Sequence, residues 1–225
     1  MSNITESYIE NYIRKVIPKS EGYLLEMEEY AFKNHVPIVH PEVGQFLKVL
    51  INIKKPKKIL EIGTAIGYSA SLMATAMGES GEILTIERRE DMINIAQENI
   101  EKNGLSGKIK IVPGDAEEIL PNIKDSFDFI FLDAAKGKYL EFFSYCIDNL
   151  ADNGIIASDN VLFKGMVASD DLVIRRKKTI VKRMREYLDY ICNNESFESC
   201  IIPIGDGVAL TYKKEVEKKW IDQNY

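Results

Sequence analysis

The feature that most constrains the fold is a series of short β-branched apolar runs that recur through the middle of the chain. There are five such runs: KKILEIG (57–63), GEILTIE (81–87), KIKIVPGD (108–115), FDFIFLDA (127–134) and GIIASDN (154–160). Their near-continuous hydrophobicity is typical of strands that are buried on both faces of a sheet. The starts of successive runs lie 19 to 27 residues apart, which leaves room for crossover helices. This alternation predicts an α/β fold with a doubly wound, mostly parallel sheet.

The flanking segments complete the predicted sheet and add helices before it. SFESCIIPIG (196–205) and GVALTYKK (207–214) meet at Asp206-Gly207, which predicts a C-terminal antiparallel hairpin. Pro41 introduces a helix whose apolar residues recur at helical spacing: Val43, Phe46, Leu47, Leu50 and Ile51. Residues 4–17 and 21–34 predict two further helices. We expect a single domain, 1–225, in which residues 1–36 are a helical extension that covers the active edge of the sheet or contacts another subunit.

Composition excludes several classes of protein. With 225 residues and 45% hydrophobic content, the chain can bury one substantial core. Its three cysteines are odd in number and have no metal-like spacing, which favours a reduced, cytoplasmic location. No leader-like N-terminus and no membrane-spanning run is present in the sequence. A formal charge of -6 argues against general attraction to nucleic acid, although a local basic patch remains compatible with it.

Ligands bind beyond the carboxyl ends of the strands in this type of sheet, so the residues at those ends indicate the chemistry. The first strand ends in EIGTAIGYSA, where Gly63 and Gly67 do not form the GxGxxG of a dinucleotide site. Glu61 in this turn suits a ligand with a positive or amino group. Glu87, 24 residues after Gly63, stands where an acid would bind ribose hydroxyls, and Asp115 could meet an adenine amine. Together they predict S-adenosylmethionine, whereas a glycine turn or an acidic helix cap is the structural alternative for each alone.

A second group of polar residues follows the last two parallel runs. Asp133 ends the fourth run, and Asp159 and Asn160 end the fifth. On neighbouring strands these three oxygen donors would lie together and select a hard cation such as Mg²⁺. Each aspartate alone is equally compatible with a helix cap or a turn. The only two histidines, His35 and His40, precede the sheet and are expected to be lid or packing residues.

Several motifs in combination resemble the cation-dependent O-methyltransferases related to catechol and caffeoyl-CoA methyltransferases. They are EIGTAIGYS, the acidic end at Glu87, GDA, FLDAAKGKY, SDN and PIGDGVAL, and the resemblance runs from about residue 37 to 213. It implies a class I S-adenosylmethionine-dependent methyltransferase fold, Rossmann-like, with seven strands in one methyltransferase domain. Ala135 departs from the pattern, because many relatives have a second aspartate there.

The resemblance also implies the roles of individual residues. The cofactor-contacting positions would be Val39, Glu61, Gly63, Tyr68, Ser69, Glu87, Asp115, Ala116 and Asp133. Asp133, Asp159 and Asn160 would bind Mg²⁺ or a similar cation such as Mn²⁺. Asp133 and Lys136 would be the catalytic residues, with Lys136 as the general base. A nearby cation would favour the neutral amine of Lys136, which could then accept the substrate proton.

The substrate is the most open part of the sequence-based prediction. The chain is similar in its motifs and its two leading helices to bacterial tRNA 5-hydroxyuridine methyltransferases. That resemblance implies methylation of 5-hydroxyuridine to 5-methoxyuridine at the tRNA wobble position, by an enzyme that is commonly a homodimer. The alternative is an O-methyltransferase for small catechol-like or phenolic molecules. A non-catalytic S-adenosylmethionine-binding module is a third reading, and it would not need the metal ligands.

A basic segment bears on the choice of substrate. In RRKKTIVKRMREYL (175–188), seven of the first eleven residues are basic and none is acidic. Helical spacing aligns four of them on one face, Arg175, Lys178, Lys182 and Arg185, and turns Ile180, Met184 and Leu188 toward the core. This face could contact the anticodon stem of a tRNA. The alternative is a solvated helix face that balances an acidic protein.

Overall fold

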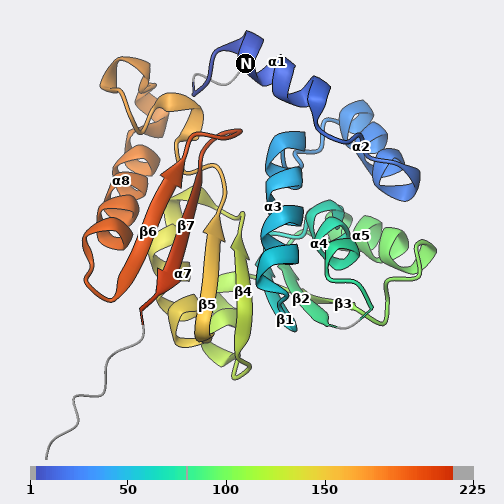
Figure 1. Cartoon of the computed structure of the whole chain (residues 1–225). Helices are drawn as coiled ribbons and strands as arrows, with labels where there is room; N and C mark the ends of the chain where they lie inside the picture. Colours follow the sequence, from blue (N-terminus) through green and yellow to red (C-terminus); the bar gives the residue numbers. More distant parts are fainter. Residues whose placement is uncertain (1–3, 80, 215–225) are drawn as a thin grey trace, which may run out of the picture.

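The computed structural model describes residues 4–79 and 81–214, so the outermost parts of the predicted domain, 1–3 and 215–225, lie outside the described residues, as does residue 80. Seven strands form one sheet in the order β3-β2-β1-β4-β5-β7-β6 (Figure 1). Strands β1 to β5 are parallel, while β7 is antiparallel to both β5 and β6. The strands are β1 (Lys58–Ile62), β2 (Glu82–Glu87), β3 (Ile109–Pro113), β4 (Phe127–Leu132), β5 (Leu150–Ser158), β6 (Phe197–Ile202) and β7 (Val208–Lys213). The predicted doubly wound sheet with a C-terminal hairpin is confirmed.

The order of the strands determines where a ligand can bind. The chain moves outward from β1 to β3 and then returns to place β4 on the other side of β1. Ile62 is level with Ile86 of β2 and with Leu132 of β4, so these strands end at the same edge. Crossover connections therefore diverge from the β1–β4 boundary, and a crevice opens outside the carboxyl ends there.

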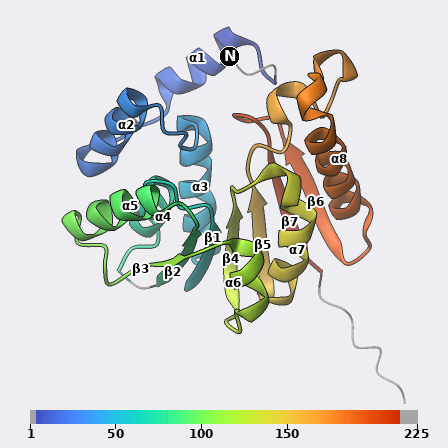
Figure 2. The same ribbon diagram turned by 180° about the vertical axis from the view of Figure 1, so that it is seen from behind.

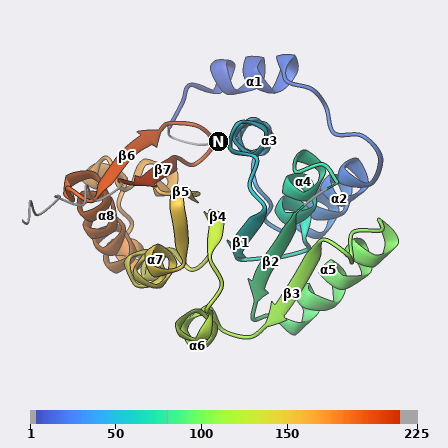
Figure 3. The same ribbon diagram turned by 60° about the horizontal axis from the view of Figure 1, so that its bottom comes forward.

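Helices cover both faces of the sheet, as Figure 3 shows. One face carries α3 (Pro41–Lys54), α4 (Tyr68–Ala76) and α5 (Glu90–Lys102), and the other carries α6 (Ala116–Ile119), α7 (Tyr139–Asp148) and α8 (Lys178–Asn193). Short 3-10 turns span Leu120–Asn122, Lys136–Lys138, Phe163–Gly165, Asp170–Leu172 and Arg175–Lys177. Successive residues of β4 point to opposite faces, so Phe129 packs in one core and Ile130 in the other. This explains why the parallel strands have no polar face.

The N-terminal segment forms the two predicted helices, α1 (Ser7–Val16) and α2 (Gly22–Asn34). Helix α1 lies across the carboxyl edge of the sheet, beyond the N-terminal end of α3, and is visible from both sides in Figures 1 and 2. Thr5 reaches the β6–β7 connection, where its hydroxyl donates to the carbonyl of Pro203 at 3.2 Å. Among the described helices, none is long and apolar enough to cross a membrane.

Two boundaries differ from the prediction. Strand β5 begins at Leu150 rather than at residue 154, because Phe127 at the start of β4 already pairs with Leu150. The β6–β7 turn is also longer than Asp206-Gly207, because Pro203 has no N–H to continue the ladder and β6 ends at Ile202. Asp206 is buried, and its carboxylate accepts from the backbone N–H of Lys164 at 2.5 Å. The turn therefore braces the loop that follows β5.

Candidate active site

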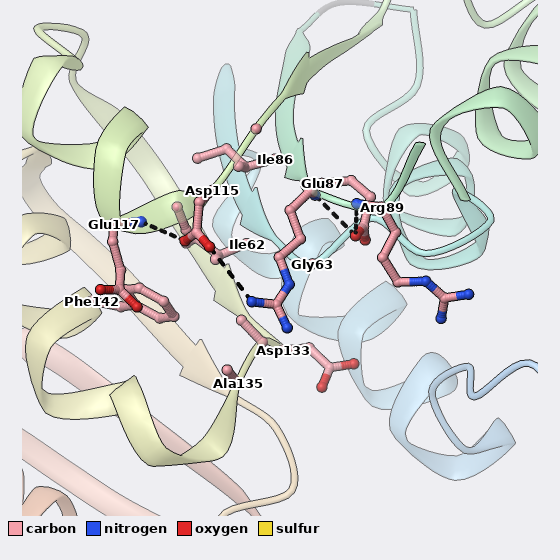
Figure 4. Close-up of a pocket in the computed structure, with 14 residues that line it drawn as sticks. Ile62, Gly63, Ile86, Glu87, Arg89, Asp115, Glu117, Asp133, Ala135 and Phe142 are labelled. Atoms are coloured by element: carbon pink, nitrogen blue, oxygen red, sulfur yellow. Dashed lines mark hydrogen bonds and ion pairs between the residues drawn. The ribbon is translucent and has the colours of Figure 1, made fainter. Parts of the chain in front are cut away.

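Two adjoining cavities lie at the carboxyl edge of the sheet. The first is lined by the ends of β1, β2 and β3, including Glu87, Asp115 and Ala116 (Figure 4). The second lies beneath the segment before α3 and is lined by five more predicted residues: Val39, Tyr68, Ser69, Lys136 and Asn160. Gly63, Glu87 and Asp133 line both cavities. The structure thus brings together most of the predicted site, while Glu61 and Asp159 lie behind its walls.

Gly63 allows the strand ends to approach closely. Its φ is 104°, a conformation that favours glycine, and a side chain there would collide with the carbonyl oxygen of Asp133. The N–H of Gly63 donates to Ile86 at 3.0 Å, and the N–H of Asp133 donates to Ile62 at 3.0 Å. The ladder therefore continues past the last paired residues, which holds Gly63 and Asp133 side by side on the floor of both cavities.

Two carboxylates in the first cavity are held by backbone N–H groups. Glu87 accepts from Ala65 at 2.9 Å with one oxygen, and from Arg88 and Arg89 at 3.0 Å with the other. Asp115 caps α6 by accepting from Glu117 at 3.0 Å. Figure 4 shows both carboxylates at the cavity wall. Each oxygen has more than one lone pair, so these fixed carboxylates can still accept hydrogen bonds from a ligand.

Glu61 lies inside the protein rather than in the cavity wall. Its side chain accepts from the hydroxyls of Ser69 and Thr85, both at 2.5 Å, and it is fully buried. Burial raises the pKa of Glu61 to about 8, and the two hydroxyls oppose the rise. Its visible effect is to fix Ser69 in the first turn of α4, so a direct contact between Glu61 and a cofactor stays a prediction.

Tyr68 connects the second cavity to the N-terminal extension. Its hydroxyl donates to Glu28 of α2, which also accepts from Ser20 at 2.5 Å. Burial and then the neighbouring Glu28 raise the pKa of Tyr68, so its hydroxyl stays protonated and donates. Part of the cavity wall is therefore fixed by α2.

The predicted metal ligands meet at the ends of β4 and β5. The Asn160 amide donates to Asp133 at 3.3 Å, and its backbone N–H donates to the Asp159 carboxylate at 2.7 Å. Asp159 is 1% exposed. Burial and then repulsion by Asp133 raise the pKa of Asp159, and burial also raises the pKa of Asp133. Across residues 4–79 and 81–214, no group of three or more His, Cys, Asp and Glu side chains is arranged to hold a metal ion. The predicted ligand set contains only two such side chains, because its third member is the Asn160 amide.

Lys136 lies in the same cavity as Asp133 and Asn160. Its Nζ is 5.9 Å from the centre of the Phe163 ring, on the loop that Asp206 braces. The positive charge of Lys136 opposes the rise in the pKa of both Asp133 and Asp159. The amine therefore lies in the same region as the carboxylate pair, and its role as general base stays a prediction.

A family profile described as O-methyltransferase matches residues 17–214. This chain belongs to the O-methyltransferase family. The match, with structural neighbours that contain SAH, confirms the predicted enzyme class, an S-adenosylmethionine-dependent O-methyltransferase. It covers α2, the whole sheet and both cavities of this methyltransferase.

Individual relatives agree with the family. The methyltransferase is 33% identical over 210 residues to a caffeoyl-CoA O-methyltransferase of Nicotiana tabacum, covering 87% of this chain and 85% of the relative. It is 32% identical over 168 residues to a catechol O-methyltransferase of Niastella koreensis, covering 72% and 76% of the two chains. The crystal structure of an O-methyltransferase from Bacillus cereus in complex with SAH superimposes with a TM-score of 0.81 at 27% identity, over 92% of this chain and 97% of that one. The narrower resemblance to tRNA methyltransferases stays a prediction.

Sequence reasoning missed the positions of two residues in this O-methyltransferase, Tyr139 and His40. Tyr139, the last residue of FLDAAKGKY, is buried and donates to the carbonyl of Asp159 at 2.7 Å, so it helps to fix that loop. His40 was expected to be a lid or packing residue, and it lines the second cavity beside Asp133 and Lys136. The local signal for His40 was its place directly before Pro41, which begins α3.

Proposed function

We propose that this O-methyltransferase transfers the methyl group of S-adenosylmethionine to a hydroxyl of a small aromatic molecule with two vicinal oxygens. One observation supports this most strongly: the cavity-lining carboxylate of Asp133, the buried carboxylate of Asp159 and the Asn160 amide lie near Lys136 where the two cavities adjoin. Relatives named for catechol and caffeoyl-CoA support a small phenolic substrate.

In this proposal the first cavity takes the nucleoside of the cofactor. The fixed carboxylate of Glu87 would accept from the ribose hydroxyls, and Asp115 would accept from the adenine amine beside Ala116. The methionine end would extend toward Gly63, Val39, Tyr68 and Ser69 in the second cavity. Glu61 would act through Ser69, whose hydroxyl it holds.

The residues Asp133, Asp159 and Asn160 suit a hard divalent cation such as Mg²⁺ or Mn²⁺. Burial raises the pKa of both aspartates, and repulsion by Asp133 further raises the pKa of Asp159. A cation would stabilise this pair, and all three side chains offer oxygen donors. When bound, such an ion would favour the ionised form of a substrate hydroxyl and help to orient a second oxygen.

Lys136 is the residue placed to take the substrate proton. Its amine shares the cavity with the carboxylates, and the sulfonium methyl is already activated, so the chain mainly has to align an oxyanion with it. The Phe163 ring, which is buried, lies beside the Lys136 amine, 5.9 Å from Nζ to the ring centre. Lys136 would therefore remove the proton of the substrate hydroxyl.

A direct assay tests the proposal. Purified protein is incubated with S-adenosylmethionine, catechol and Mg²⁺, and methylated product is measured by mass spectrometry with and without a chelator. We expect product that disappears on chelation and returns when Mg²⁺ is added in excess. Full turnover in the chelator would contradict the metal, and no product from any vicinal diol would contradict the substrate class.

A second candidate substrate is 5-hydroxyuridine in tRNA, favoured by the basic segment 175–188. Lys177 lies 5.7 Å from the centre of the Phe163 ring, which Lys136 also approaches, so this segment begins near Lys136. Met184 and Leu188 are buried and Ile180 is half-buried, as predicted for a helix with one basic face. Two members of that face have protein partners: Arg185 pairs with Asp170 at 2.8 Å, and Lys182 lies 3.7 Å from Glu186. Arg175 and Lys178 are exposed and form the strongest candidate for a phosphate contact.

A charge-reversal variant separates the two substrates. Lys178→Glu with Lys182→Glu should weaken methylation of hydroxyuridine-containing tRNA and flatten its salt dependence, because phosphate contacts release counterions. Methylation of catechol should stay near the wild-type rate. Equal effects on both substrates, or none on tRNA, would reject this face as an RNA contact. The homodimer, the cytoplasmic location and the role of residues 1–36 as lid or subunit contact stay predictions.

A further inference from the structure

A charged cluster beneath α1 is not used by the proposed reaction. Arg14 donates from Nε and Nη2 to the two carboxylate oxygens of Glu42, at 2.8 and 2.7 Å. The same Nη2 lies 2.8 Å from Nδ1 of His40, while the nearest Glu42 oxygen is 3.5 Å from that nitrogen. Glu42 is 4% exposed, and although burial opposes ionisation, its hydrogen bonds lower the pKa of Glu42 to about 2. The cluster therefore holds a permanently ionised pair against one edge of the His40 ring.

This geometry fixes which nitrogen of His40 carries a proton. A guanidinium can only donate, so in the neutral imidazole Nδ1 accepts from Arg14 and Nε2 is protonated. Protonation of Nδ1 would replace the contact with Arg14 by a hydrogen bond to Glu42, which raises the pKa of His40, while burial and the Arg14 charge oppose that rise. In the cationic form both nitrogens are protonated. Nε2 is consequently a donor in both forms.

The β6–β7 turn lies beside the base of the His40 side chain. A Cβ on Gly205 would lie 3.6 Å from Cβ and 3.7 Å from Cγ of His40. Thr5, just before α1, contacts Pro203 next to that turn, and α1 crosses from there to the start of α3, where Arg14 meets Glu42 (Figure 3). His40 lines the second cavity with Asp133 and Lys136, and within the described residues its Nε2 has no hydrogen-bond partner.

We infer that His40 is a further substrate-contacting residue, which donates from Nε2 to an oxygen of the acceptor substrate, and that Arg14 of α1 is the positioning residue that fixes this donor. The inference rests on the proposed function, because it requires an oxygen-bearing acceptor in the second cavity. It makes α1 part of the substrate site, since the group that sets the tautomer of His40 comes from that helix.

The test compares three variants with catechol as the probe. His40→Leu should raise KM for catechol about tenfold, as expected for one lost hydrogen bond, and leave the Kd for S-adenosylmethionine near the wild-type value. His40→Gln keeps a side-chain N–H donor and should recover most of that loss. Arg14→Gln should raise KM less, about threefold, and should add no further increase in the His40→Leu background. Lys15→Gln, an exposed neighbour on α1, is the matched control and should leave KM unchanged.

Two outcomes would overturn the inference. Additive effects of Arg14→Gln and His40→Leu on KM would show that Arg14 does not act through the ring. Equal KM values for His40→Leu and the wild type, in an active enzyme, would show that His40 does not touch the substrate. If the wild type methylates no vicinal diol, the proposed function fails instead. Thermal melts and cofactor titration of each variant identify unfolding, because an unfolded variant would show both a lower melting temperature and weaker binding of S-adenosylmethionine.

Discussion

The two halves of the active edge use acidic side chains in opposite ways. In the β1–β3 half, Glu87 and Asp115 already accept from backbone N–H groups at 2.9 to 3.0 Å. In the β4–β5 half, Asp133 lines both cavities and Asp159 is buried behind it, and repulsion by Asp133 adds to burial in raising the pKa of Asp159. The first pair is stabilised before any ligand arrives, whereas the second pair needs an opposite charge.

This difference indicates what each half can bind. Carboxylates held by the backbone are rigid acceptors, suited to neutral hydroxyl and amine groups whose positions must be recognised. Carboxylates that repel each other are costly in the protein alone and become favourable when a cation neutralises them. The same residue type therefore serves recognition in one half and charge binding in the other, and four predictions test that contrast.

The largest expected effect follows from Asp159→Asn. This change keeps the shape of the side chain and removes one charge from the proposed cation site. Turnover should fall at least about a hundredfold, because a cation at a developing oxyanion is worth several kcal/mol. The Kd for S-adenosylmethionine, measured by calorimetry, should change little. Wild-type turnover in this variant without added metal would contradict the assignment of Asp159.

Lys136→Ala should lower turnover about a hundredfold near neutral pH, as expected for the loss of a general base. The loss should be partly recovered at high pH, where the substrate hydroxyl ionises unaided, and cofactor affinity should be preserved. Lys138→Ala is the matched control on the same turn, since Lys138 pairs with Glu117 and Glu141 at 3.1 and 3.0 Å. A pH–rate profile identical to that of the control would make Lys136 a surface amine.

Glu87→Gln tests the recognition half. The two oxygens of Glu87 accept from the N–H groups of Ala65 and Arg88, respectively. Glutamine has one oxygen and one N–H₂ group, so a donor would face one of these N–H groups and that hydrogen bond would be lost. We expect the Kd for S-adenosylmethionine to rise about tenfold, with kcat at saturating cofactor close to wild type. A large fall in kcat with unchanged Kd would reverse the roles of the two halves.

The smallest expected effect is on stability as a function of pH. A carboxyl group whose pKa is raised on folding binds more protons in the folded state, so its contribution to stability is lost as pH rises from about 4 through the raised value. Asp133, Asp159 and Glu61 all act in this direction, and the raised pKa of His40 adds to it at higher pH. The melting temperature of metal-free protein should fall between pH 5.5 and pH 8. The fall should be about 2 to 4 °C for each kcal/mol lost from the free energy of unfolding.

The Asp159→Asn variant and added Mg²⁺ show how much the proposed cation site contributes to this fall of the melting temperature with pH. The variant should flatten the decrease without abolishing it, because Glu61 remains, and Mg²⁺ should raise the melting temperature of the wild type at pH 8 but not that of the variant. A metal-free wild type that grows more stable toward pH 8 would show that these carboxylates are not repelling each other.

The sequence by itself determined the layout of the sheet and most of the residues at its active edge. Apolar runs such as FDFIFL must be buried on both faces, and the helical segments between them impose parallel pairing. Because parallel strands end at one edge, the last residue of each run, including Glu87 and Asp133, could be assigned to one site before any contact was known. The lengths of β5 and of the β6–β7 turn were less predictable, since they depend on pairing between distant residues.

Only the tertiary structure decided which way the polar side chains turn. Glu61 and Glu87 both lie at strand ends, yet Glu61 is enclosed by Ser69 and Thr85 while Glu87 reaches both cavities. His40 depends on Arg14, 26 residues away on a helix that has no strand of its own. A periodic pattern indicates which residues of one element are buried. Hydrogen bonds between elements depend on how those elements pack, and the local sequence does not determine this packing.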